Sequence, residues 1–293
     1  MRRSVALLLA VLAAVLAGCS DDPTTVEAGD EGAGTGPTTT SGPAATVPPA
    51  GAGAVLQITT GGGFVPAEIH FANLPQFTIY ADGRVVVPGP TTLEYPGRAL
   101  PNLRTGSVGA DEVRHVVQAA EAAGVGKSLD LGRPPVADAP TTTFVLVDGE
   151  GTHRTDVYAL DIDDGPGLSA TQLDARRRLL DLVAETGRLG DTAAGPYRAT
   201  AVSVLVRPYA EVDRSGLPGE PAPAEVEWPL ADVANGGREQ FGGRCLGFTG
   251  DDAERVLSAA ADARADARWR SGATFWWLAF RPELPGAEPC ADR

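Results

Sequence analysis

The sequence predicts an α+β fold in which antiparallel hairpins are each followed by a helix. Asp82-Gly83 and Asp148-Gly149 each separate two short runs rich in β-branched residues, which is typical of a tight β-hairpin. Apolar residues recur at helical spacing after each hairpin. The predicted architecture is two β-β-α units over residues 54–189 and a C-terminal β-α-β unit over residues 190–293.

The first unit is predicted to contain a strand, a hairpin and a helix, at residues 54–59, 77–87 and 109–124. Glu112 stands in the first turn of the helix, where a carboxylate suits the helix dipole, and Gly124 is typical of a helix end. The apolar residues of this helix fall on one face: Val113, Val116, Val117, Ala120 and Ala123.

The second unit has the same order, with a hairpin at residues 141–160 and a helix that ends at Gly187. Ser169 and Gln172 have the spacing of a capping box. The predicted apolar stripe of this helix is Leu173, Leu180, Val183 and Ala184. We interpret the two units as related. The alternative is that a hairpin followed by a helix is a common way to build an α+β layer.

The C-terminal unit is predicted to hold strands at residues 199–206, 244–248 and 274–280. Its helix begins after Thr249, because Asp251 and Asp252 suit a first helical turn. The predicted buried stripe is Val256, Ala260, Ala263 and Ala267. Residues 54–189 and 190–293 form either two domains or one continuous domain.

The N-terminus has the plan of an export signal. Arg2 and Arg3 precede an unbroken apolar run over residues 5–17, and small residues then lead to Cys19. With Leu16-Ala17-Gly18 before that cysteine, the segment resembles the signal of bacterial lipoproteins over the whole lipobox. The resemblance covers only the first 19 or 20 residues. A membrane-spanning helix or a buried core helix is the alternative, but the apolar run is shorter than the ~20 residues that cross a bilayer, and Asp21 and Asp22 follow at once.

The resemblance implies a signal peptide over residues 1–18 and a lipid such as palmitate on Cys19. The mature protein would then be anchored by lipid at the outer face of the cytoplasmic membrane. Residues 19–53 are rich in threonine, glycine and proline without apolar periodicity, which predicts a disordered tether. A single lysine among abundant arginine and alanine indicates a high-GC genome, such as that of an actinobacterium.

The chain has three cysteines. If Cys19 carries lipid, Cys245 and Cys290 remain, and an oxidising compartment favours a disulfide between them. The alternatives are a reactive thiol pair or a metal site. The two cysteines lack both the C-x-x-C spacing and the additional ligands that those alternatives require.

Two glycine-containing segments fail the spacing tests for ligand loops. Residues 123–128 resemble a phosphate-binding loop, but Glu121 stands where the motif has its first glycine, and the segment follows a helix. Residues 161–165 hold three acids, but the glycine comes one position too early for a calcium loop, and Gln172 replaces its glutamate.

No catalytic residue, metal or cofactor is predicted. His70, His115 and His153 lack the spacing of a metal site, and no G-x-S-x-G motif is present. Glu225 and Glu227 share one face of a predicted short strand. They are either a pair of carboxylates that act together on a substrate or two exposed acids at a strand edge.

Four aromatic residues crowd into nine positions near the C-terminus: Trp269, Phe275, Trp276 and Trp277. Tryptophan is enriched at binding hot spots, so these residues form the candidate binding surface. Strand alternation places Trp276 and Trp277 on opposite faces. The alternative is core packing, in which both rings are inaccessible.

These observations favour a lipid-anchored extracytoplasmic binding or accessory module for an unknown protein or cell-envelope ligand. The net charge of −14 argues against a nucleic-acid partner. The first alternative is a cell-envelope hydrolase whose catalytic groups are scattered in the sequence. The second is a substrate-binding protein of an uptake system, but such a protein is expected to alternate βαβ with parallel strands.

Overall fold

The computed structural model describes residues 53–162, 167–210 and 222–291. The predicted signal peptide, Cys19 and nearly all of the predicted tether lie outside these residues. Among the described residues, no helix has the length and apolar character needed to cross a membrane. The described residues form a mixed α+β structure with two sheets.

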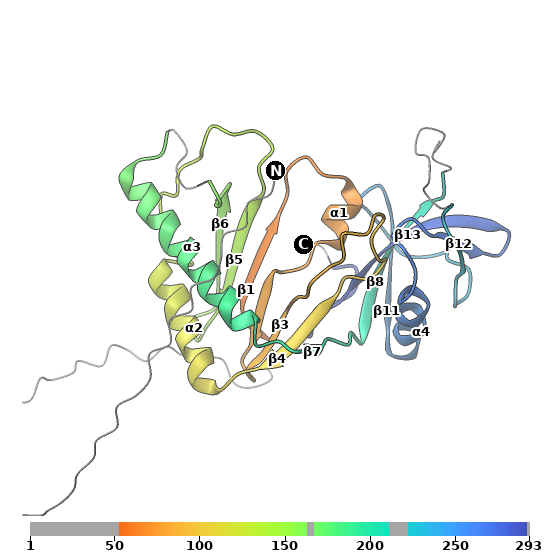
Figure 1. The fold of residues 1–293 in the computed structure, drawn as a ribbon, viewed down its shortest axis with the longest axis horizontal. Coiled ribbons are helices and arrows are strands. Elements are labelled where there is room, and N and C mark those ends of the chain that lie inside the picture. Colours follow the sequence, from red (N-terminus) through yellow and green to blue (C-terminus); the bar gives the residue numbers. More distant parts are fainter. Residues whose placement is uncertain (1–52, 163–166, 211–221, 292–293) are drawn as a thin grey trace, which may run out of the picture. The chain divides into compact units, whose positions relative to one another are not determined.

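The first sheet has seven strands in the order β6-β5-β1-β2-β3-β4-β7, and all neighbours are antiparallel. Two helices cover one face of it, α2 (Ala110–Ala123) and α3 (Ala170–Gly190) (Figure 1). The strands are β1 (Ala54–Gly61), β2 (Phe77–Tyr80), β3 (Arg84–Pro88), β4 (Leu103–Ser107), β5 (Thr141–Val147), β6 (Thr152–Tyr158) and β7 (Gly195–Pro196).

The second sheet has six strands in the order β10-β11-β8-β13-β12-β9, in which only β9 and β12 are parallel. Helix α4 (Gly250–Ala260) packs against β8 and β11. The strands are β8 (Ala201–Pro208), β9 (Glu225–Glu227), β10 (Arg238–Gln240), β11 (Gly243–Thr249), β12 (Arg268–Ser271) and β13 (Thr274–Pro282).

Both predicted hairpins are present, as β2-β3 and β5-β6. However, β4 intervenes before α2, and β1 lies between the two hairpins in one continuous sheet. Both hairpins therefore belong to the same sheet. This arrangement does not test whether the two hairpin-helix units are related, so that interpretation stays a prediction. The third helix is shorter than predicted: α4 ends at Ala260, and the buried residues Ala263 and Ala267 lie beyond it, just before β12.

The buried face of α2 is the predicted one, with Gly124 as its left-handed C-cap. The helix α3 continues past Gly187. Its predicted face is confirmed in part, because Leu180 and Val183 are half-buried and pack against the core, whereas Ala184 is exposed. The fully buried residues lie about one position away from the predicted stripe: Ala175, Arg176, Leu179, Leu182, Thr186 and Gly190. The face is shifted because Arg176 points inward and donates hydrogen bonds to the backbone carbonyls of Leu131, Tyr158 and Ala159. Sequence periodicity assigns such a charge to the solvent side.

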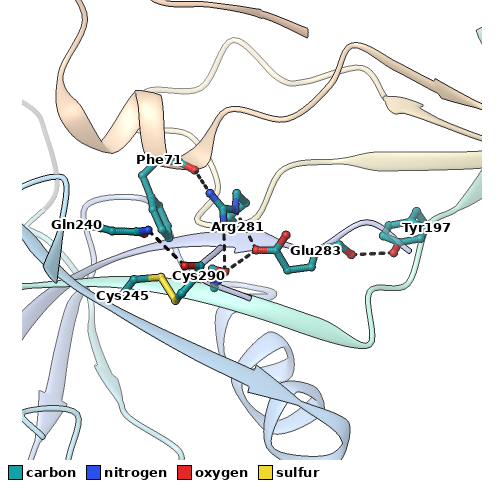
Figure 2. Close-up of polar contacts among 8 residues, drawn as sticks. Phe71, Tyr197, Gln240, Cys245, Arg281, Glu283 and Cys290 are labelled. Carbon is teal, nitrogen blue, oxygen red and sulfur yellow. Dashed lines mark hydrogen bonds and ion pairs between the residues drawn. A yellow bond between two sulfur atoms is a disulfide. The ribbon is translucent and has the colours of Figure 1, made fainter. Parts of the chain in front are cut away.

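A buried polar cluster lies where α1 (Ala67–Ala72) meets β13 (Figure 2). The Arg281 guanidinium donates from Nε to Glu283 Oε1 at 3.0 Å and from Nη1 to the Phe71 carbonyl at 3.2 Å. Both side chains are almost fully buried, with 3% and 1% exposed. Ser203 Oγ donates to Glu283, and the backbone N–H of Cys290 donates to Ser203 Oγ. The cluster therefore ties β8, β13 and the C-terminal segment to α1.

Cys290 is disulfide-bonded to Cys245 of β11, with a Cα–Cα distance of 5.8 Å (Figure 2). This is the pairing that the cysteine count predicts. The bond and the N–H donated to Ser203 together hold the C-terminal segment on the second sheet.

Stability should fall as pH rises above about 10, because two tyrosines resist ionisation in the fold. Burial raises the pKa of Tyr197 to about 12, and burial also raises the pKa of Tyr80. The unfolded chain releases these protons near pH 10. Folding therefore favours the protonated phenols, and their contribution is complete below pH 10 and is lost as pH rises toward 12. Urea unfolding at pH 9 and at pH 11 measures this loss.

The variant Tyr197→Phe should weaken the alkaline loss, since one of the two phenols is removed. The matched control is Tyr95→Phe, because Tyr95 is 81% exposed. Identical pH dependence in the wild type and in Tyr197→Phe would contradict the assignment.

Candidate functional site

The aromatic residues predicted from the sequence lie on the hairpin β12-β13. Trp269 is opposite Trp276, and Arg270 is opposite Phe275. Trp269 is only 1% exposed, and its ring packs 5.1 Å from that of Phe280 and edge-on to that of Trp228. Trp269 is thus part of the core of the second sheet.

Trp276 and Trp277 are both half-buried and belong to different packing clusters, as strand alternation predicts. Trp276 packs with the residues beneath α4, and Trp277 packs beside Phe71 and the disulfide. Neither ring is fully covered. Each ring lines a pocket of its own.

Phe275 lines neither of these two pockets. Its ring is half-buried and lies 4.8 Å from the guanidinium carbon of Arg268, which is also 5.8 Å from the ring of Tyr209. The Arg268 guanidinium is thus within cation–π distance of both rings, which stabilises the outer part of the hairpin.

We call the hollow beside Trp276 the Trp276 pocket. It has a volume of about 420 Å³ and is lined by Glu227, Trp228, Leu230, Asp232, Ala234, Arg270, Ser271, Gly272, Ala273, Thr274 and Trp276. One wall is the turn between β12 and β13, where Gly272 has a φ of 62°. Glycine adopts this left-handed conformation without the steric penalty that other residues have.

The polar groups of the Trp276 pocket are oriented by hydrogen bonds. Asp232 Oδ1 accepts from the Ala234 N–H at 2.8 Å and from Ser271 Oγ at 3.3 Å, and Asp232 Oδ2 accepts from Asn235 Nδ2 at 3.1 Å. The exposed side chains of Glu227 and Arg270 form an ion pair on the Phe275 face of the hairpin, so they border the pocket at its edge. Each carboxylate oxygen of Asp232 can accept more than one hydrogen bond, so this acid can still bind a ligand hydroxyl.

The hollow beside Trp277 is smaller, at about 280 Å³, and more charged. Arg207 Nη1 lies 3.1 Å from Glu68 Oε2, and the Arg207 guanidinium carbon is 5.8 Å from the centre of the Trp277 ring. Asp266 also lines this pocket. The one cation faces two acids here, so much of the charge is already compensated within the protein.

A third hollow, of about 680 Å³, lies on the face of the first sheet away from α2 and α3. It is lined by strand residues Gln57, Thr59, Thr143, Val145, Val147 and Arg154, by His70 and Asn73, and by the C-terminal segment from Leu284 to Glu288. Sequence reasoning missed this groove. The only local signal is the alternation of Thr143 and Val145 with buried residues in β5.

Arg154 in this groove is paired with Asp156, Nε to Oδ2 at 2.8 Å. Burial by itself raises the pKa of Asp156. Hydrogen bonds from Arg154 and Thr143 lower that pKa by more than burial raises it, so the net pKa lies below the usual range. Asp156 is therefore ionised at neutral pH, and it neutralises the arginine of the groove.

The remaining motifs give no catalytic arrangement in the described residues. The three histidines are spread out: His115 is 2.8 Å from Glu185, His153 is 3.0 Å from Asp148, and His70 lines the groove. Among the described residues, no cluster of three or more His, Cys, Asp or Glu side chains could hold a metal. The calcium-like segment falls partly in residues 163–166, which lie outside the described residues.

The glutamates of β9 form an exposed strand edge, as one of the two interpretations expects. Glu225 is paired with Arg268, and Glu227 is paired with Arg270. Each carboxylate thus has its own arginine, which differs from a pair of acids that share one substrate bond.

Comparison of the chain with protein-family models and with curated proteins finds no match.

Proposed function

We propose that this protein is a lipid-anchored extracytoplasmic binding module whose ligand occupies the Trp276 pocket. The observation that carries the proposal is a half-buried tryptophan ring beside oriented polar side chains in one hollow of ligand size. Tryptophan supplies a large rigid contact surface, and the polar groups select the ligand.

Binding is favoured over hydrolysis by the chemistry of the pocket walls. The residues that line it include no histidine, cysteine or lysine. Its two acids are already engaged, Glu227 by Arg270 and Asp232 by the backbone N–H of Ala234. A hydrolase needs a nucleophile or an activated water next to a base. The hydroxyl that contacts a carboxylate here, Ser271 Oγ, is buried and already accepts the Val233 N–H while it donates to Asp232.

The largely antiparallel sheets also differ from the alternating βαβ pattern expected of an uptake-system binding protein. The location outside the cytoplasm is supported by the lipobox match at residues 16–19 and by a disulfide, which persists in oxidising compartments.

Replacing the lipidation cysteine, Cys19→Ala, should release the protein from membranes or leave it with an uncleaved signal. The reason is that the lipid on this sulfur would be the anchor. Membrane fractionation and intact mass of the product from the native host measure both effects. The control is Cys245→Ala, which should leave membrane partitioning unchanged. Equal membrane association and mass for Cys19→Ala and wild type would refute the anchor.

Removing the Trp276 ring, Trp276→Ala, should weaken ligand capture by roughly 30-fold, the size typical of a tryptophan hot spot. The measurement is co-sedimentation of the purified full-length protein with isolated cell-envelope fragments from the native host. The matched control is Trp277→Ala, which removes the same side chain from the opposite face of β13.

Because Trp276 also packs against the core, the thermal midpoint of each variant must be measured in parallel. Thr274→Val tests the same pocket at an exposed position on the Trp276 face of β13, where the cost in stability is small. If Trp276→Ala and Thr274→Val both sediment like wild type, the Trp276 pocket is not the binding site.

A further inference from the structure

We infer that the ligand of the Trp276 pocket is a neutral saccharide of the cell envelope, bound with one sugar ring against Trp276. This inference rests on the proposed function and names its ligand class. Four features of the pocket support it: its aromatic wall, its mixed hydrogen-bonding groups, its charge and its size.

The aromatic wall consists of Trp228 and Trp276. Trp228 donates from Nε1 to the Ala231 carbonyl at 2.9 Å, and its ring lies 5.7 Å from Phe248 and 6.3 Å from Trp269. Because Trp228 is only 7% exposed, the open aromatic surface belongs mainly to Trp276. A flat aromatic ring suits a ligand that has an apolar C–H face, as a pyranose has.

The polar wall can both donate and accept hydrogen bonds, which is what sugar hydroxyls require. Asp232 provides acceptors, and the Ser271 hydroxyl, which donates to Asp232, stands beside it on the Trp276 face of the hairpin. Thr274, at the end of the turn, adds a hydroxyl that can do either. Asp232 is held in place by three hydrogen bonds, so a ligand does not have to order it.

The charge of the pocket argues against ionic ligands. Glu227 pairs with Arg270, and the Arg244 guanidinium, whose carbon lies 6.0 Å from the Trp276 ring centre, offsets the charge of Asp232. The charges around the pocket are therefore already balanced, and an ionic ligand of either sign would disturb that balance. A neutral polyhydroxyl ligand does not.

The pocket volume of about 420 Å³ falls within the range of small-molecule sites. The two other hollows described above lack this combination of features, and a further hollow of about 550 Å³ beside β3, β4 and α3 has no aromatic lining. The Trp277 pocket is smaller and brings Arg207 and Glu68 together, and the groove on the first sheet has no aromatic lining. Ring stacking with a sugar is therefore expected at Trp276 alone among these hollows.

The test is a titration of the full-length protein in detergent with neutral disaccharides of glucose, galactose, mannose, arabinose and N-acetylglucosamine. Binding is followed by calorimetry and by tryptophan fluorescence. The chain has four tryptophans, so Trp276→Phe and Trp277→Phe identify the reporting ring. At least one disaccharide should bind and change the fluorescence. Trp277→Phe should keep that change, and Trp276→Phe should lose it together with several-fold in affinity.

Two results would overturn the saccharide inference while the proposed function stands. One is capture of envelope fragments that depends on Trp276 but is not inhibited by any of the disaccharides. The other is tighter binding of a sugar phosphate, such as glucose 6-phosphate, than of its neutral counterpart. If capture itself does not depend on Trp276, the proposed function fails as well, so the two failures are distinguishable.

Discussion

Replacing Glu283 by glutamine should lower the free energy of unfolding by about 3–5 kcal/mol, the cost of breaking a buried ion pair by removing one partner. The Arg281 guanidinium lies 3.0 Å from the Glu283 carboxylate, and both side chains are almost fully buried. The substitution keeps the shape of the side chain but leaves the buried arginine without the negative charge that faces it. Urea unfolding followed by far-UV circular dichroism measures the change.

The matched control is Asp174→Asn on the surface of α3. Asp174 pairs with Arg177 at 2.9 Å, but their side chains are 65% and 64% exposed. Exposed pairs contribute about 0–1 kcal/mol, so this variant should unfold almost like wild type. Similar small losses for Glu283→Gln and Asp174→Asn would show that the buried pair does not hold the junction.

A double variant separates charge from packing. Arg281→Met combined with Glu283→Leu removes both charges and keeps the volume. Well-packed apolar replacements of buried ion pairs are often neutral or stabilising, so the double variant should recover much of the loss. The Arg281 contact with the Phe71 carbonyl would also disappear, so looser docking of α1 should appear as faster amide exchange in residues 67–72.

Breaking the Cys245–Cys290 disulfide should lower stability by about 3–4 kcal/mol in the chain-entropy model. The bond joins residues 45 positions apart and removes that loop from the unfolded ensemble. The measurement is the urea midpoint of the wild type with and without reductant. Residues 284–288, which form one wall of the groove on the first sheet, should also exchange faster when the bond is reduced.

The control is the double variant Cys245→Ala/Cys290→Ala, whose midpoint should be low and insensitive to reductant. Alanine is used because both cysteines are buried, and a serine hydroxyl there would need a hydrogen-bond partner. A wild-type midpoint that reductant does not change would contradict the stabilising role of this bond.

The two perturbations act on neighbouring contacts. Ser203 Oγ accepts the N–H of Cys290 and donates to Glu283, so the disulfide and the ion pair share one hydrogen-bond network. Their effects are therefore expected to be less than additive when combined, since loss of one already loosens the partner of the other.

Much of the local structure followed from the sequence alone. The hairpins at Asp82-Gly83 and Asp148-Gly149, the capping box at Ser169 and the placement of Trp276 and Trp277 in different clusters are all found in the structure. These features depend on turn chemistry and on the two-residue period of a strand, which act between residues a few positions apart. The cysteine pairing followed because, with Cys19 assigned to the lipid, only two cysteines remained.

Only the tertiary structure decided which surfaces are open and which charges are buried. Arg176 and Arg281 point inward because carbonyls and a carboxylate brought in from other segments satisfy them. The Trp276 pocket needs β9, Asp232 and the turn of β12-β13 at one place, and the groove needs the C-terminal segment beside β1 and β5. Burial depends on which distant elements cover a side chain, and the hydrophobic periodicity of one strand or helix does not show which elements those are.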